Sequence, residues 1–152
     1  MSGMTTDTVG LELQATEFFA TWGTTFDGMC EGFRAELADD CDWDQLPMMR
    51  TRSLTAALRF LKVAHLALGM EYVDVELLSV AVNGSVVHTQ RIDHLRRADG
   101  SLIASAPVCG VLTYEHGQVV AWKEYFDPVV FSARALLSTL VHTATFPLRR
   151  LG

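Results

Sequence analysis

Two charged residues lie on one side of a segment whose pattern otherwise predicts a buried β-strand. Side chains alternate between two faces along residues 86–96, so Arg91 and Asp93 share a face. The opposite face carries His88 and His94 and is the more polar, so we expect Arg91 and Asp93 to point inward. Burying a charge costs on the order of several kcal/mol unless it is paired and hydrogen-bonded. The pattern therefore predicts a buried ionic cluster.

The guanidinium of Arg91 is a rigid fork of donors that can bridge two carboxylates. Asp93 is the candidate for the first, and Asp127, which ends the strand-like segment 118–127, is the candidate for the second. Asp127 shares a strand face with Lys123, so we expect a bulge or bend to aim its side chain inward. Two carboxylates in one apolar pocket can act as general acid and general base if their surroundings separate their pKa values.

The elements that would position these residues follow from hydrophobic periodicity. Apolar residues at a spacing of three to four, with caps at Asp27 and Ser53, predict helices over residues 11–22, 27–37, 53–69 and 128–146. Alternating patterns separated by the turns NG, ADG and EHG predict strands over 70–82, 85–97, 101–114 and 118–127. We expect residues 38–49 to form a loop or a short extended piece.

Helices followed by an antiparallel meander predict an α+β fold in which the helices cover one face of the sheet. A strongly curved sheet wrapped in this way would leave a deep pocket with one open end. With 152 residues and no linker or repeat, we expect a single domain over residues 1–152.

Composition excludes several classes of function. The net charge of −6 does not suit binding to nucleic acid or to an anionic membrane surface, and no apolar run is long enough to span a bilayer. No signal peptide is visible at the N-terminus. The three widely spaced cysteines (Cys30, Cys41 and Cys109) favour free thiols in a reducing cytoplasm. No HExxH or CxxC spacing predicts a metal site.

Three features together resemble the limonene-1,2-epoxide hydrolases, within the wider nuclear-transport-factor-2-like (SnoaL-like) cone fold. They are the motif Arg91-x-Asp93, the segment GVLTYEHGQVVAWKEYFD that ends at Asp127, and the order of helices before a meander. The resemblance covers nearly the whole chain and is best from Val86 to Asp127.

The resemblance implies an Asp–Arg–Asp triad that opens an epoxide to a diol in one step, without a covalent intermediate, metal or cofactor. Asp127 would be the base that deprotonates a water, Asp93 the acid that protonates the epoxide oxygen, and Arg91 the bridge between them. At the positions of the family's water-holding Tyr and Asn, this chain has Trp43 and Gln45. The resemblance also implies a homodimer formed through the sheet, and a small apolar epoxide as substrate.

The residues leave other functions open. The same cone could serve as an isomerase or an epoxide-opening cyclase, in which case the water-holding residues would not be needed. It could also bind a small apolar ligand without catalysis, because buried Arg–Asp pairs are often only structural. From their apolar pattern, we expect the pocket to be lined by Leu61, Val108 and Val111.

Overall fold

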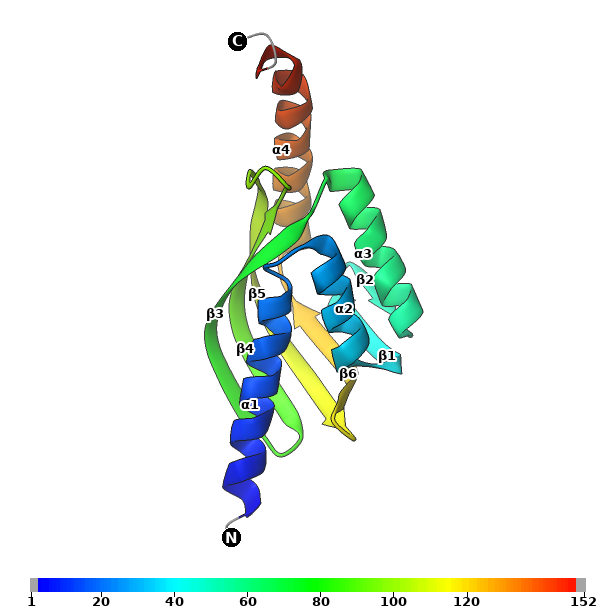
Figure 1. The fold of residues 1–152 in the computed structure, drawn as a ribbon, viewed down its shortest axis with the longest axis vertical. Helices are drawn as coiled ribbons and strands as arrows, with labels where there is room; N and C mark the ends of the chain where they lie inside the picture. Colours follow the sequence, from blue (N-terminus) through cyan, green and yellow to red (C-terminus); the bar gives the residue numbers. More distant parts are fainter. Residues whose placement is uncertain (1–2, 150–152) are drawn as a thin grey trace.

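The computed structural model describes the backbone of residues 3–149 and the side chains of residues 7–143. The helices are α1 (Gly3–Thr21), α2 (Phe26–Glu36), α3 (Leu54–Leu68) and α4 (Pro128–Arg149). The strands are β1 (Leu37–Leu46), β2 (Met49–Thr51), β3 (Tyr72–Asn83), β4 (Val86–Arg96), β5 (Leu102–Glu115) and β6 (Gln118–Tyr125). Helices α1, α2 and α3 cover one face of a curved sheet (Figure 1). The predicted α+β fold is therefore confirmed.

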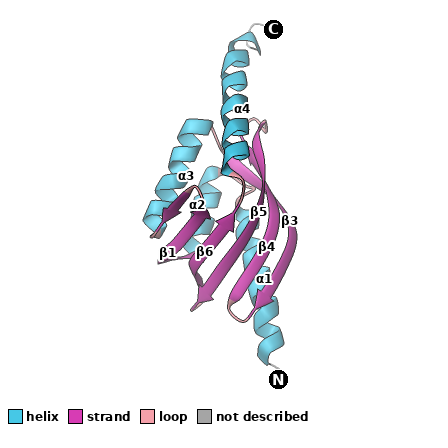
Figure 2. Ribbon diagram, turned by 180° about the vertical axis from the view of Figure 1, so that it is seen from behind, coloured by secondary structure: helices cyan, strands magenta, loops and turns pink. Residues whose placement is uncertain are grey.

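The sheet has the strand order β2-β1-β6-β5-β4-β3. Strands β3 to β6 form the antiparallel meander predicted from the sequence. Strand β1 runs parallel to β6, whereas β2 pairs antiparallel with β1. The face opposite helices α1 to α3 is open to view in Figure 2. Helices α1 to α3 therefore all lie on the same side of the sheet.

The three short turns adopt the backbone that their glycines allow. Gly84, Gly100 and Gly117 have φ angles of 61°, 82° and 80°, in the left-handed region that favours glycine. His116, next to Gly117, is also left-handed, with a φ of 51°. These turns set the register of β3 to β6.

The sequence analysis expected a loop or a short extended piece at residues 38–49, and the structure has two paired strands there, β1 and β2. Along β1 the burial alternates, with Cys41, Trp43 and Gln45 pointing inward and Asp42 and Asp44 less buried. Four aspartates in six residues disguise this period of two, because aspartate disfavours strands. An ion pair between Asp42 and Arg50 joins β1 to β2.

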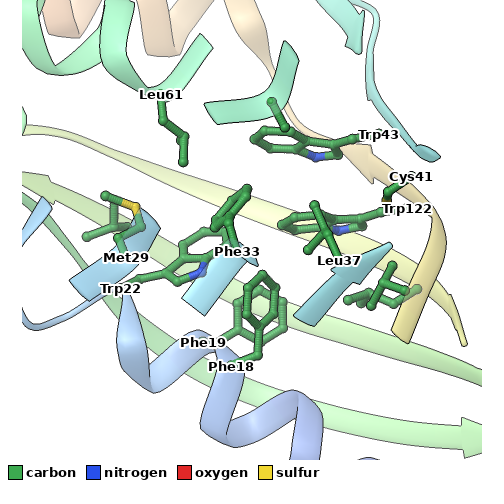
Figure 3. Close-up of a cluster of buried hydrophobic side chains, with 14 of the residues drawn as sticks. Phe18, Phe19, Trp22, Met29, Phe33, Leu37, Cys41, Trp43, Leu61 and Trp122 are labelled. Atoms are coloured by element: carbon green, nitrogen blue, oxygen red, sulfur yellow. The ribbon is translucent and has the colours of Figure 1, made fainter. Parts of the chain in front are cut away.

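The core is a cluster of aromatic rings between the helices and the sheet (Figure 3). Trp43 of β1 and Trp122 of β6 stack with their ring centroids 4.8 Å apart. Phe18 of α1 and Phe33 of α2 pack edge-on or tilted against Trp122 at 5.6 and 5.8 Å. The parallel pair β1–β6 is thereby fixed from the helix side.

Helix α4 packs its first half near the open end of the sheet and extends beyond it (Figure 1). Ser138 donates a hydrogen bond of 2.9 Å to the carbonyl of Leu102 on β5. The buried guanidinium of Arg97 donates to the hydroxyl of Thr139 at 3.2 Å. No helix in the described part of the chain is both long and apolar enough to cross a membrane.

Candidate active site

Arg91 bridges two buried carboxylates, one on its own strand β4 and one on β6, across the intervening strand β5. Its Nε donates to Asp93 at 2.8 Å, and one of its terminal nitrogens donates to Glu124 of β6. The residue exposures of Arg91, Asp93 and Glu124 are 1%, 7% and 4%, so water screens none of these charges well. Three desolvated charges in direct contact form one electrostatic unit.

Glu124 takes the place that the sequence analysis assigned to Asp127, and this is a correction. Asp127 is exposed and caps α4, accepting backbone hydrogen bonds from Val129 at 3.0 Å and Val130 at 3.1 Å. Strand parity explains the difference, because Trp122 and Glu124 point inward along β6 while the residues between and after them point out. The bulge expected to turn Asp127 inward is not needed.

Trp43 and Gln45 come to the site from β1, next to β6. The indole N–H of Trp43 donates to the second oxygen of Glu124 at 2.9 Å. The side chain of Gln45 is buried at the cavity wall and makes no hydrogen bond within the described part of the chain. The Gln45 amide is therefore available to a bound molecule, whereas the Trp43 N–H is already occupied.

The cluster lies at the wall of a cavity of about 390 Å³, within the size range of small-molecule sites. Asp93 and Glu124 both line it, together with Gln45 and residues of α3 and α4. Leu61 and Val108 line it as expected from the sequence. Val111 does not, because it pairs with His88 and Lys123 on the outer face of the sheet. The rest of the lining is almost wholly apolar.

Burial dominates the electrostatics of both carboxyl groups. It raises the pKa of Asp93 above its ordinary value, against the opposing effect of Arg91. It also raises the pKa of Glu124, where Arg91 and the Trp43 N–H oppose the shift and the charge of Asp93 adds to it. A proton on either carboxyl would leave the cluster without net charge. A buried, uncharged cluster is the state that an apolar cavity favours.

Aromatic faces enclose the guanidinium. The central carbon of Arg91 lies 4.6 Å from the ring centroid of Phe19 and 5.5 Å from that of Trp22. Both distances lie within the range of cation–π attraction, which strengthens where water is excluded. The rings thus hold the cation in the plane that meets both carboxylates.

Gly110 of β5 leaves room for the guanidinium from the sheet side. A Cβ at this position would lie 3.0 Å from an Nη of Arg91 and 2.9 Å from the hydroxyl of Thr89. Thr89 itself accepts a hydrogen bond of 3.4 Å from that Nη. Sequence reasoning missed both residues, although Thr89 shares the inward face with Arg91.

Gly110→Ala is expected to push Arg91 away from its carboxylates and to lower turnover, because the added methyl group occupies the space of the guanidinium. A misplacement of about 1 Å can cost on the order of a hundredfold in rate where catalysis depends on alignment. The measurement is a thermal melt of the variant beside the parent, together with the rate of any reaction that the parent catalyses. Gly10→Ala on α1, where no atom would lie within 4 Å of the added Cβ, tests glycine replacement without this clash. Full activity of Gly110→Ala would show that the guanidinium does not need this space.

Known proteins share this architecture. The structure of an LEH-like epoxide hydrolase from M. tuberculosis matches with a TM-score of 0.69 and 22% identity, covering 91% of this chain and 98% of that one. A protein from Jannaschia sp. CCS1, described as a SnoaL-like polyketide cyclase, matches with a TM-score of 0.62 and 18% identity, covering 82% and 93%. An NTF2-like protein of unknown function from Burkholderia pseudomallei K96243 matches with a TM-score of 0.65 and 14% identity, covering 81% and 95%.

The curved sheet with helices on one face and a cavity at its end is thus a cone fold of the NTF2-like, SnoaL-like class. The limonene-1,2-epoxide hydrolase catalytic domain matches residues 26–136, well over half of the chain. The chain belongs to the limonene-1,2-epoxide hydrolase family. No curated protein sequence is significantly similar to it.

Proposed function

We propose that the protein is an epoxide hydrolase that opens a small apolar epoxide to a vicinal diol by direct attack of water. One observation carries the proposal: Asp93 and Glu124, joined by Arg91, face the same apolar cavity. Membership of the limonene-1,2-epoxide hydrolase family supports this type of reaction. The acid and base are assigned to Asp93 and Glu124, so Asp127 has no catalytic role.

The hydrogen bonds distinguish the two carboxyls. Glu124 accepts from both Arg91 and Trp43, whereas Asp93 accepts only from Arg91 among the described side chains. Donors stabilise the ionised form of a carboxyl group, so the shared proton resides on Asp93. Glu124 is then the general base and Asp93 the general acid, each in the protonation state that its step requires.

In the proposed reaction, Glu124 takes a proton from a water as the water oxygen attacks one epoxide carbon. The bond from that carbon to the ring oxygen breaks, and Asp93 gives its proton to this oxygen. The product is a vicinal diol, and a proton passes from Glu124 back to Asp93 to restore the enzyme. Glu124 is ionised before the step and Asp93 after it, so the charge of the cluster around Arg91 stays constant.

Gln45 is the residue best placed to hold the attacking water. Its free amide offers a carbonyl acceptor and an N–H donor at the cavity wall beside Glu124. Trp43 supports the base instead of the water, since its N–H is bound to Glu124. The water is therefore held by two protein groups, Glu124 and Gln45.

The hydrogen bond from the Trp43 N–H to Glu124 favours two alternative reactions, epoxide-opening cyclisation and isomerisation. With the Trp43 N–H occupied, the cavity holds water less firmly than a site with two free holders. A substrate hydroxyl could replace the water as the attacking group, with Glu124 as its base. Isomerisation would use Glu124 to remove a proton from carbon.

A panel of cyclic and terminal epoxides in isotopically labelled water would distinguish these reactions. Hydrolysis places one labelled oxygen in the diol, whereas cyclisation of a hydroxy-epoxide incorporates none. If no epoxide reacts but apolar ligands bind in the cavity, the protein is a binder and the hydrolase proposal is rejected.

The pH dependence of kcat tests the assignment of acid and base. Activity requires Glu124 ionised and Asp93 protonated, so the rate should fall at low pH as Glu124 gains a proton and at high pH as Asp93 loses its own. Trp43→Phe removes a donor that lowers the pKa of Glu124. The acidic limb of the profile is expected to move to higher pH while the alkaline limb stays nearby. If the acidic limb did not move, the hydrogen bond from Trp43 would not lower the pKa of Glu124, and the assignment of Glu124 as the base would be contradicted.

We also propose a homodimer formed through the outer face of the sheet, which helices α1 to α3 leave uncovered (Figure 2). Exposed Leu78 and Tyr125 lie on this face. Leu78→Arg should shift the sedimentation coefficient toward that of a monomer.

The free thiols of Cys30, Cys41 and Cys109 support a cytoplasmic location, which cell fractionation would check.

A further inference from the structure

Exposed apolar side chains surround the mouth of the cavity. Val63 of α3 and Leu136 of α4 line the cavity and are also 58% and 60% exposed. Met48, between β2 and β1, lines it as well and is 40% exposed. The apolar lining of the cavity therefore continues onto the surface at these three residues.

Helix α4 extends this apolar surface along its outer side. One side of the helix, with Phe131, Ala135 and Ser138, packs on the body of the protein. The opposite side is an apolar stripe that we call the α4 stripe, and it comprises Val129, Ala133, Leu136, Leu137 and Leu140. The four large members are each at least 60% exposed. A stripe of this width is typical of a helix face buried against an apolar partner.

The charge on the two helices that frame the mouth differs from that of the chain. Neither α3 nor α4 contains an aspartate or glutamate, although the chain has 18. Both carry exposed cations, Arg59 and Lys62 on α3 and Arg134 on α4. The net charge of −6 therefore conceals a local cationic surface. Two carboxylates approach α4: Asp127 caps its N-terminus, and Asp99 faces His142 at 4.0 Å.

A second copy of the chain is the competing partner for the α4 stripe. Paired helices normally place opposite charges beside their apolar seam. Two α4 helices would instead bring Arg134 near its own copy with no acidic residue on either helix. A copy seated on the stripe would also lie across the cavity mouth. Apolar residues together with cations and without acids are the composition of helices that lie on anionic lipid.

We propose that the surface formed by α3 and the α4 stripe docks on an anionic phospholipid bilayer. The cavity mouth then faces the lipid, and an apolar substrate passes from the bilayer into the cavity without crossing water. This delivery step rests on the proposed hydrolase function, but the docking itself does not. The sequence analysis excluded membrane surfaces from net charge alone, and the separation of charge between elements is what changes that conclusion.

The test is cosedimentation of the full chain with mixed phosphatidylglycerol–phosphatidylcholine vesicles and with pure phosphatidylcholine vesicles. Binding is expected to the anionic vesicles and to weaken as salt rises, because exposed charges are screened. Neutralising a cation near an anionic surface should weaken binding about fivefold per charge. Arg59→Gln with Lys62→Gln should therefore lower the vesicle affinity by about twenty-fivefold.

Apolar variants test the α4 stripe separately. Leu137→Gln with Leu140→Gln should lower vesicle binding by at least about tenfold, through loss of buried apolar surface. Neither residue lines the cavity, so hydrolysis of a water-soluble epoxide should be unchanged. The matched control is Leu13→Gln on α1, an exposed leucine far from the mouth in sequence and on another element. Arg34→Gln on α2 is the control for charge.

The outcomes separate the possibilities. Equal binding by parent and variants, or no binding to anionic vesicles, overturns the proposal. Concentration-dependent dimers that dissociate in the Leu137/Leu140 variant, with no vesicle binding, assign the stripe to a second copy and also overturn it. Vesicle binding that follows the variants as described supports docking, even if no epoxide is turned over. Vesicle binding without turnover of any epoxide would reject the hydrolase proposal but not the docking proposal.

Discussion

Glu124→Gln is expected to abolish epoxide hydrolysis, whereas Asp127→Asn is expected to keep near-parent activity. Loss of a general base typically lowers the rate by about 10²–10⁴. Glutamine has nearly the same shape as glutamate, but its single side-chain oxygen can accept from only one of Arg91 and Trp43, which donate to different oxygens of Glu124. The packing of the side chain should be retained with one hydrogen bond fewer. Asparagine at position 127 can still cap α4, because its side-chain oxygen accepts the same backbone hydrogen bonds.

The measurement is the initial rate on the substrate that the parent turns over best, with circular dichroism as a check of folding. The contrast between the two variants decides the assignment. If Asp127→Asn were the inactive variant and Glu124→Gln the active one, the family-based assignment of the base would be restored and the geometric one rejected.

Arg91→Leu is expected to cost on the order of 3–5 kcal/mol in free energy of unfolding at neutral pH, because two buried carboxylates lose their common donor. The loss should shrink at mildly acidic pH. Burial already raises the pKa of Asp93 and Glu124, and removal of the cation raises both further. A carboxyl with a raised pKa binds its proton more tightly in the folded state. Stability therefore falls as pH rises from the ordinary carboxyl pKa toward the raised one, and more steeply in the variant.

Denaturant melts of parent and variant at neutral and mildly acidic pH provide the comparison. Arg50→Leu is the matched control, since Arg50 forms an ion pair with Asp42 at the surface and its loss should leave the midpoint unchanged. A midpoint of Arg91→Leu that equals the parent value at both pH values would mean that the cluster contributes nothing to folding.

Strand alternation was enough to place Arg91 and Asp93 correctly on the inward face of β4. The same rule applied to β6 would have selected Glu124, because it lies two residues from the buried Trp122. The position of Asp127 at the end of the apolar segment outweighed that parity, and the family resemblance then implied that Asp127 was the base. Periodicity within one strand is reliable where the strand is buried on one side, because a shift of one residue would turn every side chain to the other face.

Pairing between distant segments could not be derived in this way. Nothing in residues 37–46 indicates that they run parallel to residues 118–125, since that partnership depends on packing in three dimensions. The contact from Trp43 to Glu124 and the close approach of Gly110 to Arg91 follow from that pairing and from strand curvature. Local patterns predict the elements, and the meeting of their side chains requires the assembled sheet.

The parallel pairing of β1 with β6 also bears on how the molecule folds. Trp43 and Glu124 are 81 residues apart, so closing the loop between them costs about 4 kcal/mol in chain entropy before any contact compensates. A nascent chain leaving the ribosome exposes the apolar side of β1 until β6 has been synthesised. Contacts of such long range form late and slow the folding reaction. The contact from Trp43 to Glu124 therefore forms late, whereas Arg91 can meet Asp93 and Glu124 earlier, because all three lie within the meander of β4 to β6.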